Sequence, residues 1–218
     1  YNIPNCNYMF SFIIKFHFFF LIIYRTFIFI LCCVATIYTY VIVKKDWKTL
    51  IAGISLYSVH WFYEICNALI AAYSPLHAPL WTVTVESTSF MLMIGVCWEL
   101  SMMFSVAGML SYKVIQGTLE KNRLTYENYK GTWVKLIGAI IFALGFSFCE
   151  VFLATTNAFQ WYYPWWGFLM VFITTYVPFF LASNFVPDAN PKFQKIFLIT
   201  LITVNIVLYG VFGSLRII

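Results

Sequence analysis

The sequence predicts an all-α, polytopic bundle of transmembrane helices, and its composition and charge pattern lead to that class. Hydrophobic residues make up 62% of the 218 residues and charged residues only 10%. A water-soluble domain of this length could not bury so much apolar surface, whereas membrane-spanning helices present it to acyl chains. Basic segments also alternate with uncharged ones along the chain. We therefore expect one integral, multi-pass membrane domain that covers residues 1–218.

The first apolar run covers residues 8–43 and is too long for one crossing. At about 1.5 Å per residue it would reach about 54 Å as a single helix, whereas the hydrocarbon core of a bilayer is about 30 Å thick. No Gly or Pro lies near Arg25, where a turn between two shorter helices would be needed. We therefore predict one long first helix over residues 9–43, of which residues 26–43 cross the membrane. Two short spans are the alternative.

Prolines and polar segments divide the rest of the chain into five further apolar runs. Ser74-Pro75 and Ala78-Pro79 end the second run, and the polar segment 116–131 is the longest expected loop. Asp46 is suited to cap the helix that follows it. The helices expected from these breaks cover residues 47–73, 81–113, 132–156, 161–183 and 192–218.

The distribution of Lys and Arg predicts the topology. Segments 44–48, 113–135 and 184–195 contain 10 of the 13 basic residues, whereas the intervening loops 74–80 and 157–164 contain none. By the positive-inside rule, the basic segments share one side of the membrane. Six spans with both termini on the far side satisfy this pattern, and a seventh would place the N-terminus inside. The aromatic cluster at residues 161–166 then anchors the chain at the outer interface.

Composition and motifs remove several classes of function. The net charge of +5 comes without a basic stripe, so nucleic acid is not an expected partner. The six cysteines include no CxxC pair and no Cys/His ligand spacing, so neither a zinc site nor a disulfide framework is expected. No internal repeat is visible, which disfavours a transporter built from inverted halves. The chain begins at Tyr1 rather than Met, which leaves open whether a targeting segment precedes it.

Acidic side chains inside the apolar runs mark the candidate site, because a carboxylate in the bilayer core is costly unless it has a partner or a function. His60, Glu64 and Asn67 are spaced i, i+4 and i+7, so they share one helix face. At about 1.5 Å per residue, Glu64 lies about 24 Å and Glu150 about 27 Å from the basic side. Glu86 lies about 8 Å below the opposite end of its helix. We therefore expect these groups to form one layer near the outer leaflet.

Three interpretations of this layer remain open. Carboxylates and imidazole from separate helices bind iron, manganese or copper in some bundles, although the familiar Glu-x-x-His spacing is absent here. A buried glutamate would instead exchange protons with an apolar substrate, with His60 as its partner. In the third interpretation, hydrogen-bonded acids only hold helices together. The catalytic candidates are His60, Glu64 and Glu150; the ligand-binding candidates are Asn67, Glu86 and Glu99, the last in a separate layer near the inner end of its helix.

The segment His60–Glu64 (HWFYE) resembles the intramembrane His…Glu pattern of sterol-isomerase-like membrane proteins. The resemblance covers five residues and carries no family assignment. The leading hypothesis is a membrane protein whose polar layer binds an apolar or lipid-like molecule; enzymatic transformation of that molecule, a metal and a cofactor are left open. The alternative is a non-catalytic subunit of a larger membrane complex, which the long first helix and the lack of a large soluble domain suit.

Overall fold

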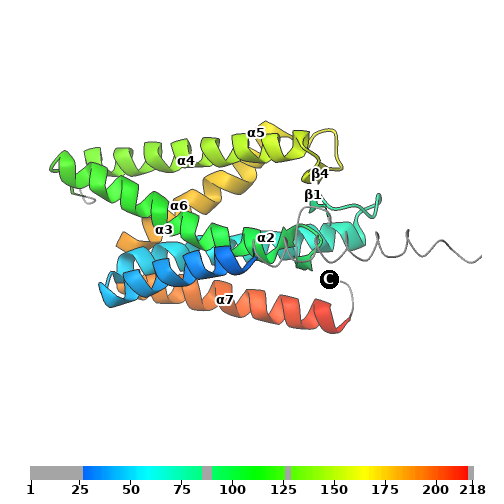
Figure 1. Ribbon diagram of the computed structural model, residues 1–218, viewed down its shortest axis with the longest axis horizontal. Coiled ribbons are helices and arrows are strands. Elements are labelled where there is room, and N and C mark those ends of the chain that lie inside the picture. The colour runs from blue at the N-terminus through cyan, green and yellow to red at the C-terminus, as the bar shows by residue number, and fades with distance from the viewer. Residues whose placement is uncertain (1–26, 85–89, 126–128, 216–218) are drawn as a thin grey trace, which may run out of the picture.

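The computed structural model describes residues 27–84, 90–125 and 129–215, and its helices run back and forth along one long axis (Figure 1). The continuous helices are Phe27–Val43, α2 (Trp47–Tyr73), α3 (Trp98–Lys121), α4 (Tyr129–Thr155) and α7 (Pro191–Ser214). Between α4 and α7 the helix changes type along its length, through α5 (Phe168–Met170), a π-helix (Val171–Tyr176), α6 (Val177–Phe185) and a 3₁₀ helix (Val186–Asp188). The helical class expected from composition is therefore confirmed.

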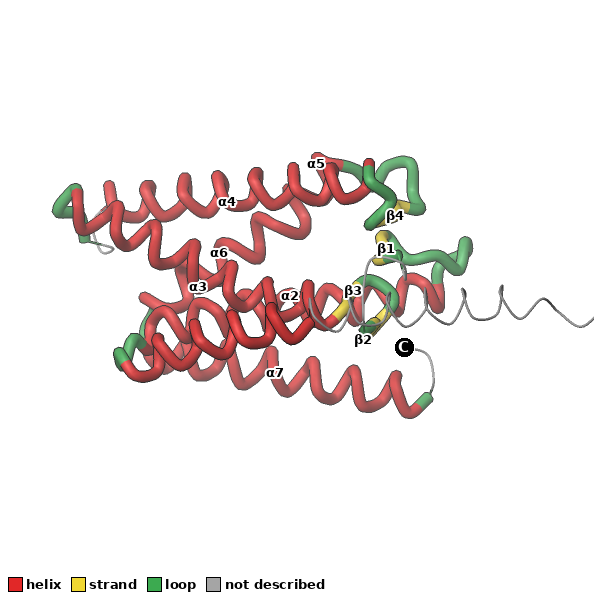
Figure 2. Tube along the Cα trace, viewed as in Figure 1, coloured by secondary structure: helices red, strands yellow, loops and turns green. Residues whose placement is uncertain are grey.

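Two short antiparallel strand pairs, which the sequence pattern did not predict, lie together at one end of the bundle (Figure 2). β1 (Trp81–Val83) pairs with β4 (Phe159–Trp161), and β2 (Met91–Met93) pairs with β3 (Val96–Cys97). We call this end the hairpin end. The turn that precedes α2 and the one that follows α3 lie at the opposite end, which we call the basic end because it carries most of the lysines.

The expected helix over residues 81–113 is wrong in its first half. The described residues there form strands and a turn, and α3 begins only at Trp98. Alternating Thr and Val at residues 82–85 favour extended backbone, because β-branched side chains fit a pleated strand better than a helix. Asn67 then fixes the start of β1, since its side-chain oxygen accepts from the backbone N–H of Leu80 at 2.7 Å. A prediction from apolar character alone therefore assigned this segment to a helix, which is wrong.

Other helix boundaries differ by smaller amounts. The helix over residues 47–73 is confirmed, and the Asp46 side chain caps it by accepting from the Thr49 amide at 3.3 Å. The expected loop 116–131 is too long, because α3 continues to Lys121 and α4 begins at Tyr129. The helix that was expected to begin at residue 161 begins only at Phe168, and Trp161 belongs to β4 instead. Of the long first helix, Phe27–Val43 is helical, and residues 9–26 lie outside the described residues.

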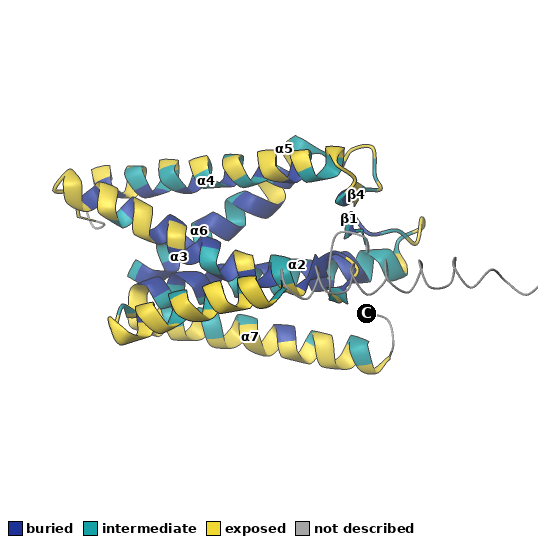
Figure 3. Cartoon of the chain, viewed as in Figure 1, coloured by how far each residue is buried: buried dark blue, intermediate teal, exposed yellow. Residues whose placement is uncertain are grey.

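Within the described residues, three helices are long and apolar enough to cross a membrane: Tyr129–Thr155, Phe168–Asp188 and Pro191–Ser214. The helix Phe27–Val43 is apolar but shorter. α7 is exposed along almost its whole length, whereas α2 carries much of the buried surface (Figure 3). α2 is therefore more central in the bundle than α7. The six-span count is not confirmed by these lengths and stays a prediction.

α2 and α3 approach each other closely because small residues face each other across their contact. A methyl group added to Gly53 would lie 2.8 Å from the Ser105 carbonyl oxygen, and one added to Gly108 would lie 2.8 Å from the Ala52 carbonyl oxygen. Small residues at such a contact let helix backbones pack tightly inside a membrane, where water does not drive helices together. This contact fixes the position of the α2 face that carries His60 and Glu64.

An ion pair at the basic end joins the turn before α2 to α3. Lys113 Nζ lies 2.5 Å from Asp46 Oδ2. Partial burial would raise the pKa of the Asp46 carboxyl, but the hydrogen bonds from Lys113 and Thr49 outweigh burial and lower that pKa. A carboxyl whose pKa is lowered on folding stabilises the protein above its unfolded-state pKa, and this contribution is lost as the pH falls through the folded-state value.

The first testable prediction concerns topology. Single cysteines introduced at Lys45 and Asn122, in a background without native cysteines, should react with a membrane-impermeant maleimide from the same side of the membrane. The reason is that both positions lie at the basic end, as the positive-inside rule requires. A cysteine at Leu76, in the turn at the hairpin end, is the control and should react from the opposite side. Labelling of Lys45 and Asn122 positions from different sides would contradict the six-span topology.

Candidate functional site

Glu64 is buried on α2, where its carboxyl group contacts two neighbours through one oxygen. Oε1 accepts from the indole Nε1 of Trp81 at 3.3 Å and lies 3.3 Å from Nε2 of His60. The contact with His60 lacks the alignment of a hydrogen bond. Oε2 has no hydrogen-bond partner among the described residues. Gly95 closes this side, since a methyl group there would clash with Oε2 of Glu64 and lie 2.6 Å from Nε1 of Trp81.

Glu150 is buried on α4 and accepts a hydrogen bond on each carboxyl oxygen. The indole Nε1 of Trp161 donates to Oε1 at 3.0 Å, and the hydroxyl of Tyr176 donates to Oε2 at 2.7 Å. Tyr176 is the last residue of the π-helix, an uncommon conformation that occurs often near functional sites. Glu150 also borders a cavity of about 200 Å³ whose other walls are mainly apolar.

One strand pair connects the two glutamates. Trp81 and Trp161 are direct partners in the β1–β4 ladder, and each donates its indole N–H to one of the two carboxyl groups. The Trp81 ring also stacks on that of Trp166, with ring centroids 5.4 Å apart. The two strands therefore hold α2 and α4 together through a matched pair of Trp–Glu hydrogen bonds. We call His60, Glu64, Glu150 and their donors Trp81, Trp161 and Tyr176 the carboxyl layer.

Aromatic rings fill the space between these polar groups. The imidazole of His60 stacks on Phe104 with centroids 4.3 Å apart, and Phe104 stacks on Tyr176 with centroids 6.2 Å apart. The polar groups of the layer are therefore embedded in aromatic packing.

The remaining candidate residues have different positions. Both polar groups of the Asn67 side chain bind backbone, because Nδ2 donates to the Trp81 carbonyl at 2.8 Å and Oδ1 accepts from the Leu80 amide. Asn67 therefore positions Trp81. Glu86 lies outside the described residues. The expected position of Glu99 near the inner end of its helix is wrong, because α3 begins at Trp98 and Glu99 lies in its first turn, at the hairpin end.

The metal interpretation gains no support from the geometry. In the parts of the chain that the structure describes, no group of three or more His, Cys, Asp or Glu side chains is placed to hold a metal ion. Acid–base chemistry and structural hydrogen bonding remain as interpretations of the carboxyl layer.

A second buried polar cluster, centred on Asp188, has no counterpart among the residues expected in a site. Its carboxylate pairs with Lys48 at 2.7 Å and with Lys135, and accepts from the Tyr112 hydroxyl at 3.0 Å and from Gln116 Nε2 at 2.9 Å. These partners belong to α2, α3 and α4, so one carboxylate joins three helices at the basic end. The sequence gives little indication of this cluster, because Asp188 follows a proline and Lys135 lies in a charged segment that is typical of a loop.

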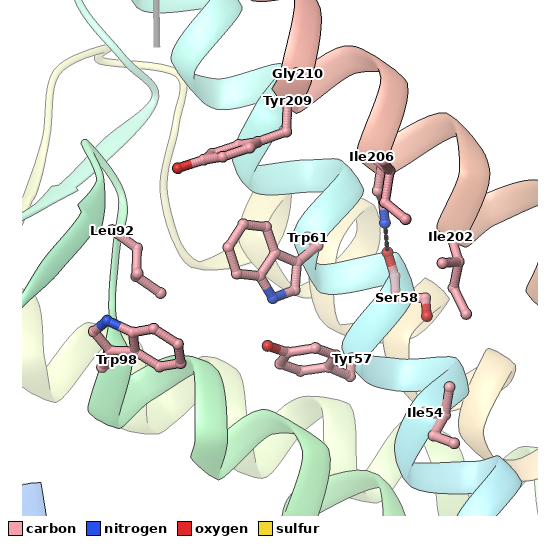
Figure 4. A pocket seen from close by; sticks show the side chains of 11 residues that line it. Ile54, Tyr57, Ser58, Trp61, Leu92, Trp98, Ile202, Ile206, Tyr209 and Gly210 are labelled. Carbon is pink, nitrogen blue, oxygen red and sulfur yellow. Dashed lines mark hydrogen bonds between the residues drawn. The ribbon is translucent and has the colours of Figure 1, made fainter. Parts of the chain in front are cut away.

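A cavity of about 720 Å³ lies between α2 and α7 (Figure 4). Its walls are the aromatic rings of Tyr57, Trp61, Trp98 and Tyr209, the aliphatic side chains of Ile54, Leu92, Ile202 and Ile206, and the smaller residues Ser58, Asn205 and Gly210. None of these lining residues is charged. On α2 the lining positions 54, 57, 58 and 61 form one helical face, next to the face that carries the carboxyl layer.

The comparisons with known proteins agree with the membrane class. A protein of Archaeoglobus fulgidus, described as an "Uncharacterized protein", is 28% identical to this chain over 164 residues, which is 74% of each chain. No solved structure matches. A family model described as "Uncharacterized membrane protein family" matches residues 9–214. Because this match covers nearly the whole chain and three described helices are long and apolar enough to span a bilayer, the protein is an integral membrane protein that belongs to this family.

Proposed function

We propose that the protein binds a lipid-like molecule in the cavity between α2 and α7. The observation that carries this proposal is the cavity itself, whose volume of about 720 Å³ falls within the range of small-molecule sites. Its walls are apolar and aromatic, with a few polar groups, as in most such sites. Because α7 is an exposed, apolar helix, a ligand would enter from the hydrocarbon region of the bilayer.

The carboxyl layer is included in the proposal as the place where the bound molecule would exchange a proton. Trp61 lines the cavity and directly follows His60, so the two sites lie on neighbouring faces of α2. Two facts support a role beyond helix packing. In the described part of the chain, neither His60 Nδ1 nor Glu64 Oε2 has a hydrogen-bond partner, although both atoms are buried. A buried polar atom without a partner is destabilising and is often kept for a function.

A subunit of a larger membrane complex remains the alternative proposal. It rests on the exposed apolar surface of α7, which a partner helix could cover. Acyl chains would cover the same surface equally well, so the binding proposal, which has a defined cavity, is the one we develop.

A matched pair of glycine substitutions tests ligand binding. Gly210 and Gly213 both lie on α7, and a methyl group added to either would meet no atom within 4 Å, but only Gly210 lines the cavity. Gly210→Leu should therefore fill ligand space without straining the protein, and should reduce binding about 10-fold or more. Gly213→Leu changes the same helix in the same way and should bind as the unsubstituted protein does.

The measurement is photocrosslinking of the full chain in liposomes with a C18 chain that carries a diazirine, followed by peptide mapping. Adducts should concentrate on the lining residues of α2 and α7, and Gly210→Leu should remove them. Adducts spread evenly over the exposed faces, or equal yields from the two glycine variants, would refute the binding site. If the retained molecule is also converted, Glu64→Gln should keep binding and abolish conversion, since it preserves shape but cannot act as a carboxyl acid.

A further inference from the structure

α2 and α7 lie side by side along the cavity and run in the same direction. The side-chain nitrogen of Asn205 donates to the Ser58 carbonyl at 2.7 Å, the bond drawn as a dashed line in Figure 4. About one turn further along both helices, the rings of Trp61 and Tyr209 meet edge to face, with centroids 5.9 Å apart. Both helices begin at the basic end, so each lining residue has a definite position along the length of the cavity.

Aliphatic and aromatic side chains line different ends of this cavity. Ile54 on α2 and Ile202 on α7 lie nearer the basic end. Trp61 and Tyr209 follow about 10 Å further along the same two helices, toward the hairpin end. Trp98 reaches the cavity from the first residue of α3, which begins at the hairpin end. The cavity therefore has an aliphatic end and an aromatic end.

The rings at the aromatic end have surface that a ligand can contact. Trp98 and Tyr209 are each 42% exposed, and Tyr57 and Trp61 are partly buried. Gly210 leaves further room beside these rings, because a methyl group there would meet no atom of the described residues within 4 Å. Contact with this end therefore requires no rearrangement of the protein.

We infer that the ligand of this cavity has a flat conjugated ring joined to an aliphatic chain, and that it binds with the ring toward the hairpin end. This inference rests on the proposed function and specifies its ligand class. Aromatic rings attract each other beyond the effect of buried area, in offset-stacked or edge-to-face arrangements that a puckered aliphatic ring does not reproduce. A cavity of about 150 Å³ holds benzene. The volume of about 720 Å³ therefore leaves room for a chain along the aliphatic end.

Three hydrocarbons of equal carbon number test the preference for a flat ring. Dodecylbenzene, dodecylcyclohexane and octadecane are similar in size and carry no polar group, and only the first has a conjugated ring. Each competes with tritiated dodecylbenzene for saturable binding to the full-length protein in detergent, and the affinities are corrected for the partition of each compound into micelles. Dodecylbenzene should bind about 5-fold more tightly than the other two, because it alone gains aromatic contacts.

Two substitutions of Tyr209 connect this preference to the aromatic end. Tyr209→Leu removes one ring and should reduce the preference for dodecylbenzene over dodecylcyclohexane about 3-fold. Tyr209→Phe is the matched control, because it keeps the ring and should keep the preference. Neither change should prevent folding, since Tyr209 is not buried. An unchanged preference in Tyr209→Leu would contradict contact between the ligand ring and this end.

Photocrosslinking tests the orientation of the ligand. One dodecylbenzene probe carries a trifluoromethyl diazirine on the ring, and a second carries a diazirine at the end of its chain. The ring probe should label Trp61, Trp98 and Tyr209, whereas the chain probe should label Ile54 and Ile202.

The outcomes separate this inference from the proposed function. Equal affinities for the three hydrocarbons, tighter binding of octadecane, or exchange of the two labelling patterns would overturn the inference while the binding site stands. Absence of saturable binding by every probe, or binding unaffected by Gly210→Leu, would instead refute the proposed function.

Discussion

Asp188→Leu is expected to lower the free energy of unfolding by about 3–5 kcal/mol, because it removes one partner of a buried ion pair. The side chains of Asp188 and Lys135 are each only 3% exposed, so the substitution would leave the ammonium group of Lys135 buried without its carboxylate partner. The substitution also removes the acceptor for Tyr112 and Gln116. Urea unfolding in detergent micelles, followed by circular dichroism, would measure the loss.

Two further variants isolate the charge effect. Lys48 pairs with the same carboxylate, but its side chain is about half exposed, so Lys48→Met should cost about 1 kcal/mol or less. Lys135→Met added to Asp188→Leu should recover part of the stability, because removing both partners of a buried pair is milder than removing one. Equal losses for Asp188→Leu and Lys48→Met would show that burial does not strengthen the cluster.

Glu150→Leu is expected to lower the free energy of unfolding by about 2–6 kcal/mol, because it leaves two donors without an acceptor at about 1–3 kcal/mol each. These donors are the Tyr176 hydroxyl and the Trp161 indole N–H. Glu150→Gln keeps one acceptor oxygen and nearly the same shape, so its loss should be less than half as large. Thermal unfolding monitored by tryptophan fluorescence would rank the variants.

A double-mutant cycle checks the Tyr176–Glu150 hydrogen bond. Tyr176→Phe alone should cost about 1 kcal/mol, the usual net contribution of a hydrogen bond. In the Glu150→Leu background the same change should be neutral or stabilising, because the hydroxyl has already lost its acceptor. Additive losses would mean that the two side chains do not interact.

The sequence predicted helices well where local signals mark both ends. α2 has a capping aspartate before it and two prolines after it, and its predicted bounds are those of the structure. Residues 81–97 have no such signals, and their apolar character suited a helix. β1 pairs with β4, about 80 residues further along the chain, so this pairing is a tertiary effect that local pattern does not contain, whereas β2 and β3 pair locally with each other.

The candidate site could be predicted in part for the same reason. The i, i+4 spacing of His60 and Glu64 follows from one helix, and both residues lie together as that spacing requires. The donors to the carboxyl groups come from other elements, and Trp161 in particular was interpreted as an interface anchor. The cavity depends on α2 and α7 lying side by side, and the bond that joins them spans 147 residues. No local feature of either helix predicts it.

The π-helix at Val171–Tyr176 sets the rotational phase of its own last residue, Tyr176, and of the residues between it and α7. Its wider turn places one more residue in the helix than a regular α-helix would, and one residue corresponds to a rotation of about 100°. Tyr176 and Asp188 both follow from this offset, although they meet partners at opposite ends of the bundle. Deleting one residue from the wide turn would therefore rotate the side chains of Tyr176 and Asp188 away from their partners together. The geometry of both the carboxyl layer and the Asp188 cluster thus depends on one local departure from regular α-helix.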